Sequence, residues 1–282
     1  MQPKYINPFT DFGFKRLFGE EANKDILIDF LNELLREEEG EIVNITYLNP
    51  EQLGRSSTER RAVFDIYCEN ELGEKFIVEM QKAKQDYFKE RSVFYSTFPI
   101  REQAERGEWN FDLKAIYTIG ILDFVFDEDK DDPDKLFYRV KLSDIDTHEV
   151  FYDKLTFMYI EMPKFTKTLE ECETHFDRWL YVLKNLEMFE SYPEKLQERI
   201  FKKLFGEASL ANMGNKELVA YEDSLKVYRD NMNTMRYAIR EATKEAAKEA
   251  MARGLEQGYV DVAKKMKGNG IDIKMIAQCT GL

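Results

Sequence analysis

The chain has 282 residues, 43% of them hydrophobic, which is enough for one large domain or two small ones with a sizeable core. No stretch approaches the roughly 20 apolar residues that span a bilayer, and the first residues lack the apolar run of a signal peptide, so we expect no membrane partner. The net charge of −13 argues against non-specific nucleic-acid binding through the whole surface, although a local basic cleft remains compatible with it.

Cysteine and histidine are scarce in this sequence. The three cysteines, Cys68, Cys172 and Cys279, are odd in number and far apart, which argues against a disulfide framework or a zinc knuckle and fits a reducing cytoplasm. The only histidines are His148 and His175, so a His-based triad or a histidine-rich metal site is not expected. If the protein is an enzyme, carboxylates are its expected catalytic groups.

The N-terminal third predicts helices followed by strands. Residues 11–36 predict a helix in two pieces, and the second piece has an apolar stripe at helical spacing with Asn23 as its N-cap. Residues 42–48 predict a strand, followed by a polar loop over residues 49–60. Two β-rich runs then flank a turn signal at residues 70–73, which predicts a hairpin.

The middle of the chain predicts one more helix and further strands. Residues 85–107 have a helical pattern, which Pro99 should kink or split. Residues 111–126 form the longest apolar run and predict a central strand. Strands are also expected at residues 136–142 and 154–161, after an acidic loop.

From Thr168 onward the sequence predicts helices. A capping box of Thr168 and Glu171 should begin a helix that ends near Phe189, and Pro193 suits the first position of the next helix. We therefore place a helical C-terminal extension at residues 191–282, after a first domain at residues 1–190.

Within this extension, residues 215–257 predict one long helix or two. Their richness in Ala, Glu and Lys, with charge pairs four residues apart, favours an exposed helix or a coiled coil and therefore a homo-oligomer. The final stretch GIDIKMIAQCTGL predicts a short helix capped near Gly281. It lacks a second recognition helix, so it is not expected to read a DNA groove alone.

The predicted hairpin carries the residues that could perform chemistry. Side chains alternate along a strand, so Glu79 and Gln81 share one face, and the turn can bring Asp65 of the first strand close to Glu79. Two carboxylates in contact repel each other and are costly to desolvate. A divalent cation would relieve both effects, and oxygen ligands with water suit Mg²⁺ or Mn²⁺. The alternative, favoured by spacing alone, is two carboxylates on a half-solvated sheet face.

Several stretches taken together resemble the PD-(D/E)XK nuclease family transposases, also called the Rpn recombination-promoting nuclease family. In the pattern D-(x)13-E-x-Q, Asp65 matches the motif Asp and Glu79 the motif Glu, and Gln81 stands where most members of the superfamily have Lys. Family relatives also carry Gln at this position. The stretches are TDFGFKRLFG (10–19), ILIDFLNELL (26–35), the pair VFDIYC and FIVEMQ, RSVFYST (91–97) in the next predicted helix, and GIDIKMIAQCTGL at the end.

The resemblance implies a fold and an activity. The fold is α/β of the restriction-endonuclease type, a mixed β-sheet flanked by helices. The activity is metal-dependent endonuclease cleavage of DNA linked to transposition or recombination, with Mg²⁺ or Mn²⁺ held by Asp65 and Glu79. Gln81 is the third catalytic candidate, and its neutral amide can orient water but cannot stabilise a hydroxide electrostatically. The alternative is a catalytically weak or inactive nuclease-like module for DNA binding or protein assembly.

Further residues near the expected site could support it. Asp11 and Lys15 lie one helical turn apart, and the alternative to a supporting role is an exposed ion pair in a capped first turn. Arg91 and Tyr95 have the same spacing and could contact DNA phosphate, although core packing is the slightly favoured interpretation of Tyr95. Lys82 could add local positive charge, or it could belong to a solvated strand end.

Overall fold

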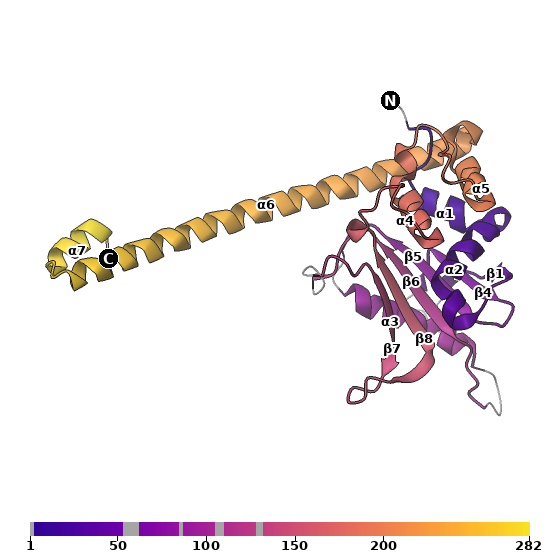
Figure 1. Ribbon diagram of the computed structural model, residues 1–282, viewed down its shortest axis with the longest axis horizontal. Helices are drawn as coiled ribbons and strands as arrows, with labels where there is room; N and C mark the ends of the chain where they lie inside the picture. The colour runs from indigo at the N-terminus through magenta and orange to yellow at the C-terminus, as the bar shows by residue number, and fades with distance from the viewer. Residues whose placement is uncertain (1–2, 53–61, 85–86, 105–109, 128–131) are drawn as a thin grey trace. The chain divides into compact units, whose positions relative to one another are not determined.

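The structure, a computed structural model, describes residues 3–52, 62–84, 87–104, 110–127 and 132–282. It contains two compact units, Met1–Tyr228 and Arg229–Leu282. The first unit holds the β-sheet, and the second consists of most of a long helix and a short helix after it (Figure 1). The first unit therefore includes helices from the beginning of the extension that the sequence places after residue 190.

The sheet has six strands in the order β1-β4-β5-β6-β8-β7. β4 pairs antiparallel with β1 and β5, β5 and β8 both pair parallel with β6, and β7 pairs antiparallel with β8. The predicted mixed sheet and its central strand are therefore confirmed. The strands of this sheet are β1 Ile45–Tyr47, β4 Ile66–Asn70, β5 Lys75–Gln81, β6 Ile116–Leu122, β7 Phe137–Ser143 and β8 Val150–Glu161, and a separate pair consists of β2 Glu51–Gln52 and β3 Ala62–Val63.

Helices cover both faces of the sheet (Figure 1). On one face, Phe76, Val78 and Met80 of β5 join the large core formed with α1, α2, α4 and α5. On the other face, Ile77 of β5 joins a smaller core with Phe98 of α3. The predicted alternation of β5 is therefore confirmed. The helices of the described residues are α1 Asp11–Phe18, α2 Lys24–Glu39, α3 Phe88–Glu102, α4 His175–Asn185, α5 Arg199–Ala208, α6 Asn215–Gly268 and α7 Ile273–Thr280.

The predicted N-terminal helix in two pieces corresponds to α1 and α2. α1 begins at a Thr10 N-cap, whose Oγ1 accepts the N–H of Gly13 at 2.9 Å. A Cβ on Gly13 would lie 2.2 Å from the carbonyl oxygen of Asn7, so this turn requires glycine. Asn23 occupies the N-cap position of α2, but its side chain donates to the carbonyl of Arg16 instead of capping the helix.

Two predicted helix starts are wrong. The helix expected after Thr168 begins later, because the true capping box is Thr174 with Asp177 at the start of α4. Thr168 and Glu171 do bond to each other, but they close a turn, since a local side-chain bond forms equally well in a turn and at a helix end.

Pro193 also lies in a turn, closed by the N–H of Leu196, and α5 begins at Arg199. The position of α5 in the chain follows from packing, because its residues Phe201, Leu204 and Phe205 are buried in the large core. Pro99 lies inside α3 and does not split it. Residues 53–60 of the predicted polar loop lie outside the described residues.

The two helical segments predicted near the C-terminus correspond to α6 and α7. α6 is one helix of 54 residues rather than two. α7 ends at Gly281, whose φ of 74° is the left-handed conformation that glycine adopts without strain. Among the residues that the structure describes, no helix combines the length and the apolar character needed to cross a bilayer.

Candidate active site

The β4–β5 hairpin sets the relation between the two motif acids. Its turn is held by Asn70, whose Oδ1 accepts the N–H groups of Leu72 and Glu74 at 3.0 and 2.9 Å. Gly73 supplies the positive φ, 78°, that closes the turn. The resulting register pairs Ile66 with Val78. One residue further from the turn, Asp65 therefore lies opposite Glu79.

Asp65 itself lies in a bend between β3 and β4, where the sequence predicts a continuous strand. At the bend, each of the two carboxylates accepts a backbone N–H from the opposite segment of the hairpin. The N–H of Asp65 donates to Glu79 Oε1 at 3.1 Å, and the N–H of Met80 donates to Asp65 Oδ2 at 2.8 Å. The structure therefore brings Asp65 and Glu79 together at the end of the hairpin that lies away from its turn.

Burial makes this pair of carboxylates unstable as two anions. Only 8% of Glu79 is exposed, and burial followed by repulsion from Asp65 raises the Glu79 pKa to about 8. Burial also raises the pKa of Asp65, against the lowering effect of the Met80 N–H. At neutral pH the pair therefore retains a proton unless a cation replaces it.

The donor set of this pair fits a hard divalent cation. One oxygen of each carboxylate accepts a backbone N–H, which orients the side chain and leaves Asp65 Oδ1 and Glu79 Oε2 without a hydrogen bond from a described residue. Within the described residues, no group of three or more His, Cys, Asp or Glu side chains could hold a metal. Mg²⁺ suits such a sparse site because it uses one or two carboxylates and fills its other positions with water and phosphate oxygens.

Gln81 lies on the same face as Glu79 and is held at both ends of its amide. Its Nε2 donates to the carbonyl of Ala83 at 3.1 Å, and its Oε1 accepts from Arg91 Nη2 on α3. Arg91 in turn lies over the rings of Phe88 and Tyr95, at 5.0 and 5.7 Å from their centroids. A cation from α3 therefore reaches the site beside the neutral amide.

The other predicted supporting residues surround the pair at longer range. Asp11 and Lys15 form an ion pair at 3.0 Å on α1, and the Lys15 charge lowers the pKa of both Asp65 and Glu79. The ring of Tyr95 packs edge-on against Phe64, with centroids 5.2 Å apart.

Lys82 is half-buried, and burial lowers the pKa of its ammonium, against the raising effect of Asp11 and Asp65. Its ammonium lies 6.0 Å from the ring centroid of Tyr228. The lysine therefore belongs to the surroundings of the acid pair rather than to a fully solvated strand end.

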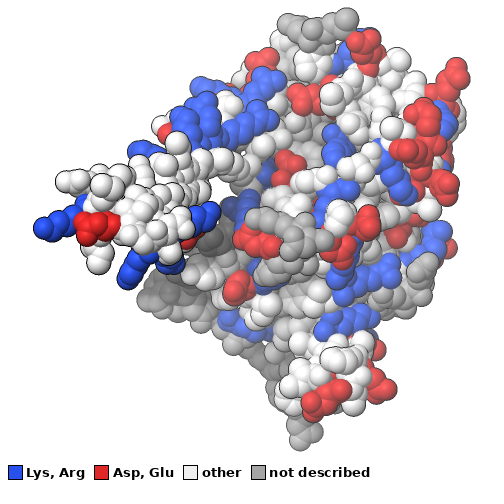
Figure 2. All heavy atoms as spheres, turned by 60° about the vertical axis from the view of Figure 1, so that its left-hand side comes forward, with Lys and Arg blue, Asp and Glu red and all other residues white. Residues whose placement is uncertain are grey.

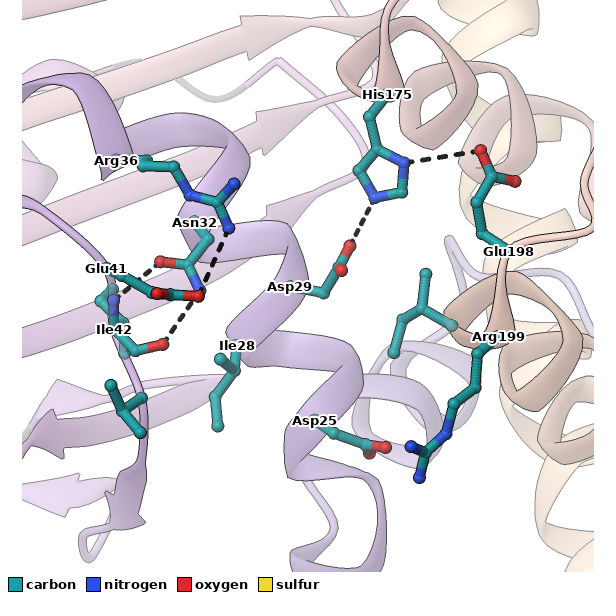
Figure 3. A pocket seen from close by; sticks show the side chains of 12 residues that line it. Asp25, Ile28, Asp29, Asn32, Arg36, Glu41, Ile42, His175, Glu198 and Arg199 are labelled. Carbon is teal, nitrogen blue, oxygen red and sulfur yellow. Dashed lines mark hydrogen bonds and ion pairs between the residues drawn. The ribbon is translucent and has the colours of Figure 1, made fainter.

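A pocket apart from the acid pair, which the sequence does not predict, lies between α2, α4 and α5 and has a volume of about 630 Å³ (Figure 3). Its central acid is Asp29, whose Oδ1 lies 2.7 Å from His175 Nε2 and accepts the Trp179 indole N–H at 2.7 Å. At the far side of the pocket, Asn32 exchanges two hydrogen bonds with the backbone of Ile42. The scarcity of histidine is the only sequence signal that points to this region.

The surface charge agrees with a local rather than a general polyanion site. Figure 2 shows basic and acidic side chains interspersed over the described surface that faces the viewer. With a net charge of −13, attraction of a polyanion depends on cations gathered at one place. Lys15, Lys82 and Arg91 around the acid pair form such a group.

The comparisons with known proteins agree with the geometry. A family model described as PD-(D/E)XK nuclease family transposase matches residues 8–238, which include the acid pair and all the cations around it. No curated protein and no solved structure matches the chain.

Proposed function

The chain belongs to the PD-(D/E)XK nuclease family transposases, and from this premise we propose that it is a metal-dependent DNA endonuclease that acts in transposition or recombination. The observation that carries the proposal is the meeting of Asp65 and Glu79. Asp65 is partly buried and Glu79 almost wholly buried, and the two acids lie together at the end of β5. Their repulsion does not stabilise the fold, so the arrangement points to a functional site.

In this proposal, Asp65 and Glu79 hold one Mg²⁺ or Mn²⁺ ion. A divalent ion bound there would polarise a phosphate oxygen and lower the pKa of a bound water. The backbone N–H groups of Asp65 and Met80 fix the orientation of the carboxylates. Glu79 would have to give up its retained proton to hold the ion, so metal binding should release protons and strengthen as the pH rises.

The cations around the pair would bind the substrate. Lys15 on α1, Lys82 after β5 and Arg91 on α3 come from three different elements and act electrostatically on the acid pair. Phosphate contacts of this kind position a DNA strand without reading its sequence. Because Gln81 is neutral, any side-chain charge that stabilises the reacting phosphate beside the metal would come from one of these residues.

A plasmid-nicking assay tests the proposal. Wild-type protein with Mg²⁺ or Mn²⁺ should convert supercoiled plasmid to nicked or linear DNA, and Asp65→Ala should reduce the rate by about a hundredfold or more, because half of the metal-holding set is lost. Asp112→Ala is the matched control, since Asp112 is an exposed acid that forms ion pairs with Lys114 and Lys154. Cleavage by a variant that lacks both Asp65 and Glu79 would reject the assignment of these residues as the nuclease site.

The second candidate function is a nuclease-like module that binds DNA or assembles protein without cutting. It is favoured by the sparse donor set, since two carboxylates are the only His, Cys, Asp or Glu side chains that the described residues bring together there. Calorimetric titration separates the two functions, because absence of binding at millimolar Mg²⁺ and Mn²⁺ by the folded protein would favour the second.

We also propose that the unit Arg229–Leu282 supports a homo-oligomer. Apolar side chains remain exposed along its part of α6, among them Met251, Leu255 and Tyr259. A chain that ends at Asn231 should contain fewer chains per particle than the full chain, as calculated from the mass in light scattering. An unchanged number of chains per particle would reject the idea.

A further inference from the structure

A phosphodiester-cleaving site gains from a positive side chain near the phosphate in addition to its metal, and Gln81 does not supply one. Most members of the superfamily that the chain resembles carry lysine at this position, whereas an amide has dipoles but no charge. The question is which of the nearby cations takes over this work, and the contacts of Gln81 point to one of them.

Arg91 is the cation that is directly joined to Gln81. Its Nη2 donates to Gln81 Oε1, while Gln81 Nε2 donates to the carbonyl of Ala83, so the amide has one defined orientation. The guanidinium also lies over the rings of Phe88 and Tyr95, which restricts its rotation. A planar group held in this way loses little conformational entropy when it binds a phosphate.

The packing of α3 brings Arg91 to the acid pair. Gly120 of β6 lies beside Glu79 in the sheet. A Cβ on Gly120 would lie 3.4 Å from Phe88 Cζ and 3.1 Å from Tyr159 Cδ1, so the first turn of α3 sits tightly against the strand at this point. Arg91 follows Phe88 by three residues and therefore projects from nearly the same side of the helix.

The geometry points to Arg91 as the residue that supplies a DNA phosphate at the Asp65–Glu79 site with the positive charge that position 81 lacks, and to Gln81 as the positioning residue that aims it. This inference rests on the proposed nuclease function.

The two lysines near the site are less suited to this task. Lys15 is paired with Asp11 at 3.0 Å on α1. Lys82 follows the last residue of β5, and its ammonium lies 6.0 Å from the ring centroid of Tyr228. Neither lysine is hydrogen-bonded to Gln81.

Moving the charge tests the assignment. Arg91→Ala should lower kcat/KM for plasmid nicking by about a hundredfold, as loss of a charge-stabilising donor does, and adding Gln81→Lys to Arg91→Ala should recover at least about a tenth of the wild-type value. Arg101→Ala, a charge lost from the last turn of the same helix, should change kcat/KM by less than about twofold.

A DNA-binding measurement gives a readout that does not depend on cleavage. In EDTA, the affinity for a fluorescent duplex should depend less steeply on salt in Arg91→Ala, by about one unit of the logarithmic slope, because one phosphate contact is lost. Gln81→Ala should keep the wild-type slope but lower kcat by about tenfold, because it removes orientation and not charge. If Arg91→Ala does not fold, Arg91→Lys, which keeps the charge, should retain the slope and lose kcat.

The outcomes separate this inference from the proposed function. If wild-type protein cleaves and requires Asp65, but Arg91→Ala is as active as Arg101→Ala, only the role of Arg91 is overturned. The role of Arg91 is also overturned if Gln81→Lys does not rescue Arg91→Ala. The same holds if Lys82→Ala lowers kcat/KM by about a hundredfold while Arg91→Ala leaves it unchanged. If wild-type protein does not cleave, the nuclease proposal fails, and an unchanged salt slope in Arg91→Ala then rejects the phosphate contact independently.

Discussion

Glu79 in β5 and Glu161 in β8 are two buried glutamates of one sheet with opposite surroundings. Glu161 is 0% exposed, and it accepts the N–H of Phe126 at 2.6 Å and pairs with the Lys164 ammonium at 2.8 Å. Glu79 is almost as buried and also accepts a backbone N–H, but the charge of a second carboxylate, Asp65, acts against it. A buried acid with a cation and donors belongs to the fold, whereas one packed against another acid is maintained at a cost in stability.

The largest expected effect is the loss of stability on breaking the Glu161 pair. Glu161→Gln keeps the shape of the side chain but leaves the ammonium of Lys164 without its anion, so the free energy of unfolding should fall by about 3 kcal/mol. Urea denaturation at pH 7 measures it. The double variant Glu161→Gln with Lys164→Met should recover much of the loss, and a loss below about 0.5 kcal/mol would mean that pairing does not distinguish the two glutamates.

Glu79→Gln should change the free energy of unfolding in the opposite direction and raise it. The folded-state pKa of Glu79 is raised to about 8 from the ordinary glutamate value of 4.5, so the folded protein binds more protons than the unfolded chain between these values. Wild-type stability should therefore fall as the pH rises from 5 to 8.5, and Glu79→Gln, which carries no charge, should be more stable than wild type by about 2 kcal/mol at pH 8.5 and nearly equal at pH 5.

Metal provides the control for this second comparison. Mg²⁺ or Mn²⁺ should raise the melting temperature of wild-type protein at pH 8.5, because an ion that binds only the folded state stabilises it. The same ions should leave Glu79→Gln almost unchanged. If Glu79→Gln is more stable than wild type by the same amount at pH 5 and at pH 8.5, Glu79 does not carry a raised pKa.

The smallest effect concerns Asp29, a partly exposed acid with a titrating partner. Burial lowers the pKa of His175, but the hydrogen bond and charge of Asp29 outweigh it, so the net shift is upward. The stabilisation is therefore present at low pH and disappears as the pH rises through the raised pKa. His175→Gln should cost about 1 kcal/mol at pH 5.5 and less at pH 9, with the exposed His148→Asn as control.

The site was only partly predictable from the sequence. The shared face of Glu79 and Gln81 follows from strand alternation, and the turn residues from Asn70 to Gly73 indicate the hairpin. The bend at Asp65 and the start of α4 are not visible in the sequence, because a local pattern such as Thr168 with Glu171 satisfies a turn as well as a helix. The roles of the motif residues in catalysis stay predictions.

The side chains of β5 that face each core could be assigned from the sequence, because a period of two is a property of the strand alone. The contact between Asp65 and Glu79 depends on the folded hairpin, since one residue of register would turn one of them away. The contact between Arg91 and Gln81 depends on the tertiary structure, because the position of a helix over a sheet follows from the packing of residues distant in the chain, such as Phe88 against Gly120.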